Sequence, residues 1–145
     1  MSNWIDETAL SEFLLPYDHV FLIPIPLHKQ RFRERGFNQA ELISQHINTL
    51  LQNTHHLKNR VEIKKNYLSR RINTPQQAQM RNDMRDVNVL NAFTAHLPKK
   101  NKKGVYVLID DVCTTGATMR AAADALQKSP HFSPEMRICG ISLAD

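Results

Sequence analysis

The sequence predicts an α/β fold in which a mostly parallel central sheet is flanked by helices. Short apolar runs over residues 19–23, 107–109 and 136–144 are bounded by proline or charged residues, which is typical of strands buried on both faces. Between them, residues 39–51 carry apolar side chains at helical spacing, and residues 119–128 are strong helix formers. Strands that alternate with helices in this way favour a parallel sheet under helices.

The chain of 145 residues is expected to form a single domain, with an N-terminal segment over 1–17 and a core over 18–145. A helix is predicted over residues 5–15, ended by Pro16 and anchored by Trp4. Residues 61–63 and 67–68 are weak strand signals. Three further apolar residues are expected in the core: Val87, Val89 and Phe93.

Residues 107–118 are the most informative stretch, because an apolar strand ends on Asp110 and Asp111 and passes through a hydroxyl-rich turn into a helix. The acids then lie at the carboxyl end of a strand, where open α/β sheets bind ligands. Backbone N–H groups of the turn and the start of the helix suit an anion, and Gly116 permits its close approach. We predict a phosphate cradle made by Cys113, Thr114, Thr115, Gly116, Ala117 and Thr118.

Two acids beside a phosphate would repel it, so we expect Asp110 and Asp111 to face sugar hydroxyls or a hydrated Mg²⁺. A ligand that presents a phosphate to the turn and hydroxyls or a bound metal to the acids is predicted to be a ribose 5-phosphate. Two alternatives are an acidic metal pocket without a sugar and an ordinary helix N-cap made by Thr114 or Thr115. The cradle is favoured because a cap needs one hydroxyl, whereas this turn supplies three around a glycine.

A basic segment follows the strand over residues 19–23. It carries His28 and four cations within a few residues, and is predicted to be a loop held beside the sheet by a turn at Gly36 and a helix N-cap at Asn38. A solvated basic loop without a ligand is the alternative.

Composition limits the remaining choices. The net charge is +5 and the sequence pI about 9.4, which favours anionic partners without choosing between a phosphorylated metabolite and nucleic acid. No apolar run approaches the ~20 residues of a membrane span, and no leader pattern is seen, so a cytoplasmic protein is expected. Cys113 and Cys139 do not suggest a disulfide framework.

Residues 108–118 resemble the 5-phosphoribosyl 1-pyrophosphate (PRPP) motif of type I phosphoribosyltransferases. Together with the runs over residues 24–28 and 35–39, they resemble the ComF family, which is associated with competence and DNA uptake. The resemblance covers residues 18–144 and implies a Rossmann-like type I phosphoribosyltransferase fold that binds PRPP and Mg²⁺.

The resemblance also implies roles for individual residues. Asp110 and Asp111 would hold the ribose hydroxyls and the metal, partly through water, and residues 113–118 would hold the 5-phosphate. The turn of Pro26, Leu27 and His28 would be the pyrophosphate loop, with His28 and Arg35 among the catalytic residues. The candidate cations for contacts with pyrophosphate are Arg31, Arg33 and Arg35.

A mobile segment that closes over the ligand in related enzymes is matched by Gln77, Arg81, Arg85 and Asn88. Thr74, Pro75 and Gln77 form a complete capping box as well, so a purely structural role for Gln77 stays open.

Two departures from the family's pattern stand out. The sequence has no Cys-x-x-Cys of the N-terminal zinc module, and the last strand ends in Asp145 in place of arginine. A phosphoribosyltransferase is expected. The alternative is a non-catalytic module of the DNA-uptake machinery that binds PRPP, single-stranded DNA or a competence protein. The acceptor base and the oligomeric state stay open, with a homodimer as one alternative.

Overall fold

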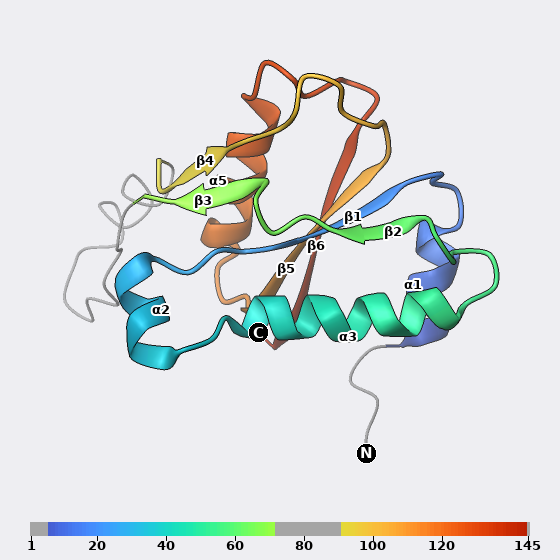
Figure 1. Cartoon of the computed structure of the whole chain (residues 1–145), viewed down its shortest axis with the longest axis horizontal. Helices are drawn as coiled ribbons and strands as arrows, with labels where there is room; N and C mark the ends of the chain where they lie inside the picture. Colours follow the sequence, from blue (N-terminus) through green and yellow to red (C-terminus); the bar gives the residue numbers. More distant parts are fainter. Residues whose placement is uncertain (1–5, 72–90, 145) are drawn as a thin grey trace.

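The computed structural model describes residues 6–71 and 91–144. Its elements follow in chain order (Figure 1): α1 (Glu7–Leu14), β1 (Val20–Pro24), α2 (Lys29–Arg35), α3 (Gln39–Asn53), β2 (Val61–Ile63), β3 (Leu68–Arg70), β4 (Phe93–Ala95), β5 (Val105–Val112), α5 (Ala117–Gln127) and β6 (Arg137–Ala144).

In the described residues the central sheet has the strand order β2-β1-β5-β6, and every neighbouring pair is parallel. Val20 of β1 pairs with Val61 on one side and with Val105 on the other. The α/β fold class is thereby confirmed. A second sheet, in which β3 and β4 pair antiparallel, lies to one side (Figure 1). The sequence indicated only the first of these two strands, and weakly.

Both faces of the central sheet are buried, and β5 contributes to both. Val105, Val107 and Ile109 point into one core with residues of α1 and α3, whereas Tyr106 and Leu108 point into the other with residues of α5, β3 and β4. This alternation follows from the two-residue period of a strand. The prediction of a central strand buried on both faces is confirmed.

The basic segment after β1 is a helix, and the prediction of a loop was wrong. Lysine, glutamine, arginine and glutamate dominate Lys29–Arg35, and these are good helix formers. Gln30 donates to Glu34 one turn later at 3.2 Å, and Gly36 ends the helix in the left-handed conformation at φ 77°. A high density of charge was mistaken for the absence of regular structure.

Other boundaries differ from the prediction by a few residues. Helix α1 begins at Glu7 with Asp6 as its N-cap, and Phe13, expected in the apolar stripe, is 51% exposed. Strand β5 continues past its two acids, because Asp110 and Val112 still pair with β6. Phe93 is buried as predicted. Trp4, Val87 and Val89 lie outside the described residues.

All four parallel strands run in one direction, so their carboxyl ends share one edge of the sheet. The residues that follow β1 and β5 therefore meet there. Among residues 6–71 and 91–144, none of the helices has both the length and the apolar character that a bilayer crossing needs.

Candidate functional site

The segment after β1 is tied directly to β5 at the carboxyl edge. The N–H of Ile25 donates to the carbonyl of Ile109 at 2.8 Å, beside Asp110. The carbonyl of Ile25 accepts from Nδ2 of Asn38 at 3.0 Å, while Oδ1 of Asn38 accepts from the N–H of Ala40 at 3.1 Å. Asn38 is 7% exposed and caps α3, as predicted. One amide side chain thus fixes both the turn before α2 and the start of α3.

Replacing Asn38 with alanine is expected to lower the free energy of unfolding by about 1 to 3 kcal/mol, because a buried carbonyl and a helix cap lose their partner together. Urea denaturation measures this. Gln45→Ala, at an exposed position of the same helix, is the control and should change stability by less than about 0.5 kcal/mol. Equal effects of the two substitutions would contradict the role given to Asn38.

The two acids are held by their own backbone. Oδ1 of Asp110 accepts from the N–H of Asp111 at 2.9 Å, and Oδ1 of Asp111 accepts from the N–H of Val112 at 3.0 Å. Burial, together with the hydrogen bond with the Asp111 side chain, raises the pKa of Asp110 to about 6, although the backbone N–H of Asp111 and the charge of Arg70 act to lower it. The charged form of such a half-buried carboxyl group is stabilised when a cation or a hydroxyl donor is bound beside it.

The turn after β5 begins helix α5 without a side-chain cap. Gly116 occupies the N-cap in the left-handed conformation at φ 75°, and no N-cap side-chain hydrogen bond is made there by the described residues. The ordinary N-cap by Thr114 or Thr115 is therefore wrong as an account of this turn. Oγ1 of Thr115 accepts from the N–H of Ala117, the first residue of the helix, at 3.3 Å.

The run of donors is shorter than predicted. The N–H of Cys113 donates to the carbonyl of Ala144 at 2.9 Å, so the sheet uses it. Within residues 6–71 and 91–144, no partner is recorded for the N–H groups of Thr114, Thr115, Gly116 and Thr118. These four donors surround the positive end of the α5 dipole. The N-terminus of a helix with such free donors can bind an anion.

The basic helix α2 starts at the same edge. His28 is its N-cap and accepts through Nδ1 from the N–H of Gln30 at 3.3 Å. Arg33 and Arg35 lie exposed in the last turn, where Nη1 of Arg35 donates to Oε1 of Gln39 at 2.8 Å. Arg31 is half-buried, and its charge acts on Arg70. The structure thus distinguishes three arginines that the sequence left equivalent.

Arg70, at the end of β3, is a residue that the sequence interpretation missed. Its guanidinium carbon lies 5.4 Å from the centre of the Phe93 ring, on the strand paired with it. Burial lowers the pKa of Arg70, the charge of Arg31 lowers it further, and the charge of Asp110 raises it. Two arginines from different elements therefore lie within electrostatic reach of each other beside an acid, although like charges repel. An arginine two residues after the weakly predicted strand at 67–68 was the available signal.

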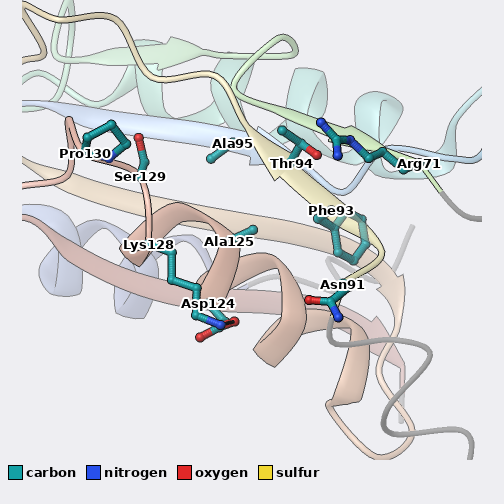
Figure 2. Close-up of a pocket in the computed structure, with 10 residues that line it drawn as sticks. All are labelled: Arg71, Asn91, Phe93, Thr94, Ala95, Asp124, Ala125, Lys128, Ser129 and Pro130. Carbon is teal, nitrogen blue, oxygen red and sulfur yellow. Dashed lines mark ion pairs between the residues drawn. The ribbon is translucent and has the colours of Figure 1, made fainter.

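Gln77, Arg81, Arg85 and Asn88 fall outside the described residues. A hollow of about 290 Å³ lies between β4 and α5 (Figure 2), and its lining includes Phe93 and Ala95 of β4 and Asp124 and Ala125 of α5. It is open and contains none of the predicted site residues, so the candidate site is placed by the strand ends and not by this hollow.

The donor set at the edge fits a hydrated Mg²⁺. Asp110 and Asp111 offer two carboxylates, and Mg²⁺ in proteins is commonly held by one or two carboxylates plus water and phosphate oxygens. In the described part of the chain, no three histidine, cysteine or acidic side chains cluster as a metal site.

An open parallel sheet with two acids, an uncapped glycine turn and a basic helix at its carboxyl edge defines an α/β protein of the class that binds ligands where its strands end. The sequence has relatives among known proteins. It is 33% identical over 115 residues to Competence protein ComFC of Bacillus subtilis (strain 168), covering 77% of this chain and 40% of that protein. It is 34% identical over 110 residues to Competence protein F of Haemophilus influenzae, covering 74% and 44%.

A third relative is DNA utilization protein YhgH of Escherichia coli (strain K12), 29% identical over 108 residues, covering 74% of this chain and 43% of that protein. These relatives support assignment of the chain to the ComF family, so the resemblance inferred from the motifs is confirmed. The chain spans less than half the length of each. No protein-family model and no solved structure matches it significantly.

Proposed function

We propose that this chain binds PRPP with Mg²⁺ at the carboxyl edge of its sheet and transfers the phosphoribosyl group to an acceptor. One observation carries the proposal: two acids on β5 lead directly into an uncapped turn with Gly116 in the left-handed conformation. The turn offers N–H donors to a phosphate, and the acids offer carboxylates to sugar hydroxyls and a metal. A sugar phosphate is one of few ligands that would use N–H donors for a phosphate and carboxylates for hydroxyls at positions so close in the chain.

The proposal divides the ligand between elements. The turn over residues 113–118 holds the 5-phosphate, and Asp110 and Asp111 hold the ribose hydroxyls and the metal. Pyrophosphate lies toward the turn before α2, where Pro26, Leu27 and His28 follow β1. Arg31 and Arg70 face it as cations, because both act electrostatically at this edge and a bound anion would relieve their mutual repulsion.

The proposed reaction breaks the bond between the anomeric carbon and the pyrophosphate oxygen, and pyrophosphate leaves with the bonding electrons. The acceptor forms a new bond to that carbon and releases its proton to solvent. The ribose ring becomes cationic as the bond breaks, by analogy with glycoside chemistry. The cations at the edge stabilise the negative charge that develops on pyrophosphate, and this is their contribution to the rate. Bound Mg²⁺ would supply further charge neutralisation.

The names of the relatives support a role in competence or DNA use. Two are called competence proteins and a third a DNA utilization protein. We propose that this chain likewise acts in the uptake of DNA or the use of its nucleotides.

Incubating the protein with PRPP, Mg²⁺ and a panel of nucleobases while measuring released pyrophosphate tests the proposal. Release that depends on a base supports transfer. Saturable PRPP binding without release, measured by calorimetry, supports the non-catalytic alternative. Absence of any PRPP binding contradicts transfer and the PRPP-binding form of the alternative, and leaves its DNA-binding or partner-binding form. Single-stranded DNA is titrated separately at two salt concentrations, because binding through phosphate contacts weakens as salt rises.

Replacing Arg70 with methionine is expected to weaken PRPP binding at least about tenfold, since methionine keeps the contact with Phe93 but removes the charge. Binding of ribose 5-phosphate, which lacks pyrophosphate, should change less than threefold. Calorimetry with both ligands measures the two effects.

Arg71→Met is the matched control, because Arg71 is exposed and its replacement removes the same charge one residue later in the chain. It should leave both affinities within about twofold of the parent protein. Similar losses for the two variants would show that net charge, and not the position of Arg70, matters.

A further inference from the structure

Arg120 lies in the first turn of α5 and reaches back over the turn that precedes the helix. Its Nη1 donates to the carbonyl of Thr115 at 2.9 Å, and its own N–H donates to the carbonyl of Gly116 at 2.9 Å. A Cβ atom placed on Gly116 would come within 3.0 Å of the same Nη1. The guanidinium therefore lies against Gly116, which has no side chain to displace it.

This contact fixes one peptide unit. In a trans peptide, the carbonyl of one residue and the N–H of the next point in opposite directions. Because Arg120 holds the carbonyl of Thr115, it also sets the direction of the N–H of Gly116. That N–H has no recorded partner among the described residues and belongs to the proposed phosphate turn.

The charge of Arg120 is unusual for its place. The first turn of a helix favours acids, and a cation there is repelled by the helix dipole. Helix α5 has no acidic residue in its first turn, and none of the ion pairs formed by the described residues includes Arg120. A cation held at the positive end of a helix is favoured once an anion is bound there.

We infer that Arg120 is a positioning residue for the phosphate turn: by holding the carbonyl of Thr115 it keeps the N–H of Gly116 directed at the 5-phosphate of the ligand. This inference rests on the proposed function, since it assigns the way in which the turn of that same site is kept ready. Without Arg120, the peptide between Thr115 and Gly116 is free to rotate, and the N–H turns away from the ligand in part of the population.

The glycine amides allow a direct test, because the chain has only four glycines. A sample labelled with ¹⁵N-glycine gives signals for Gly36, Gly104, Gly116 and Gly140, which are followed by NMR while ribose 5-phosphate is added. In the parent protein, the Gly116 amide proton should move downfield with saturation, while the Gly104 and Gly140 signals stay. In Arg120→Met, the Gly116 shift should fall to less than half, and ribose 5-phosphate should bind about tenfold more weakly.

Two further variants separate positioning from bulk charge. Arg120→Lys keeps a donor and should recover most of the Gly116 shift, with affinity within about threefold of the parent. Arg137→Met removes one positive charge from an exposed residue at the opposite end of the sheet, and should leave the Gly116 shift unchanged. Thermal unfolding of Arg120→Met should match the parent protein, which shows that the variant is folded.

The outcomes are distinguishable. If the parent protein shows a Gly116 shift and Arg120→Met shows the same shift and affinity, the role of Arg120 is overturned while the proposed function stands. Equal losses in Arg120→Met and Arg137→Met would also overturn it. If the parent protein binds neither ribose 5-phosphate nor PRPP, the proposed function fails, and the inference about Arg120 fails with it.

Discussion

Replacing Asp110 with asparagine is expected to reduce PRPP-dependent pyrophosphate release at least about 100-fold and, at the same time, to stabilise the protein at neutral pH. The loss of activity follows from the proposed contact of Asp110 with the ribose and the metal, because removing one group that stabilises developing charge typically costs this much. The gain in stability follows from burial, which raises the pKa of Asp110 to about 6.

The direction of the pH dependence follows from the two states of the chain. The pKa of Asp110 is about 6 in the folded protein, against an ordinary pKa of 3.8 for an aspartate side chain. Between these values the folded protein holds a proton that the unfolded chain has released. The contribution of Asp110 to stability is therefore most favourable below about pH 4 and declines as the pH rises through 6. Asparagine carries no such dependence.

At pH 7 the variant should exceed the parent protein by about 1 to 3 kcal/mol in free energy of unfolding, and at pH 4 the two should be nearly equal. Urea denaturation at both pH values measures this. Asp18→Asn, an exposed acid before β1, removes the same charge and is expected to change stability by less than about 0.5 kcal/mol at either pH. A destabilised Asp110→Asn at pH 7 would contradict the account of its environment.

Replacing Gly104 with alanine is expected to destabilise the protein by about 3 kcal/mol or more, and to lower its melting temperature by about 10 °C. A Cβ atom on Gly104 would lie 2.3 Å from the carbonyl oxygen of His19 and 3.0 Å from its carbonyl carbon. That carbonyl accepts from the N–H of Val105 at 3.0 Å, and the carbonyl of Gly104 accepts from the N–H of Arg137 at 3.1 Å. Backbone must therefore move where β1, β5 and β6 begin.

Gly140→Ala is the matched control, since Gly140 lies in β6 next to the same central strand. The nearest atom to a Cβ there is Sδ of Met119 at 3.1 Å, which belongs to a flexible side chain. This substitution should cost less than about 1 kcal/mol. Thermal unfolding of both variants measures the difference, and comparable destabilisation would show that the close approach at Gly104 is not what matters.

Local patterns in the sequence were sufficient for several elements. The apolar strands, the capping role of Asn38 and the burial of β5 on both faces are confirmed. Each depends on short-range chemistry: the period of a strand or helix, or one amide that caps the residues next to it. Helix α2 was missed because its charges obscured an ordinary helical composition, although Gly36 marked its end.

The cations of the candidate site depended on contacts distant in sequence. Arg70 matters because β3 pairs with β4 and brings its side chain over Phe93 and toward the charges of Arg31 and Asp110. No residue near Arg70 in the sequence indicates that Phe93, Arg31 and Asp110 are its neighbours in the fold. The use of the Cys113 N–H by Ala144 likewise depends on how far β6 pairs with β5.

The sequence by itself determined the α/β class, the family resemblance and the position of the acids and the glycine turn along the chain, because these depend on periodicity and on a contiguous motif. Only the tertiary structure decided which donors of that turn the sheet consumes and which arginines lie near Asp110. The physical reason is that hydrogen bonds and electrostatic interactions depend on distance in space, and the folding of the sheet, not the order of residues, sets those distances.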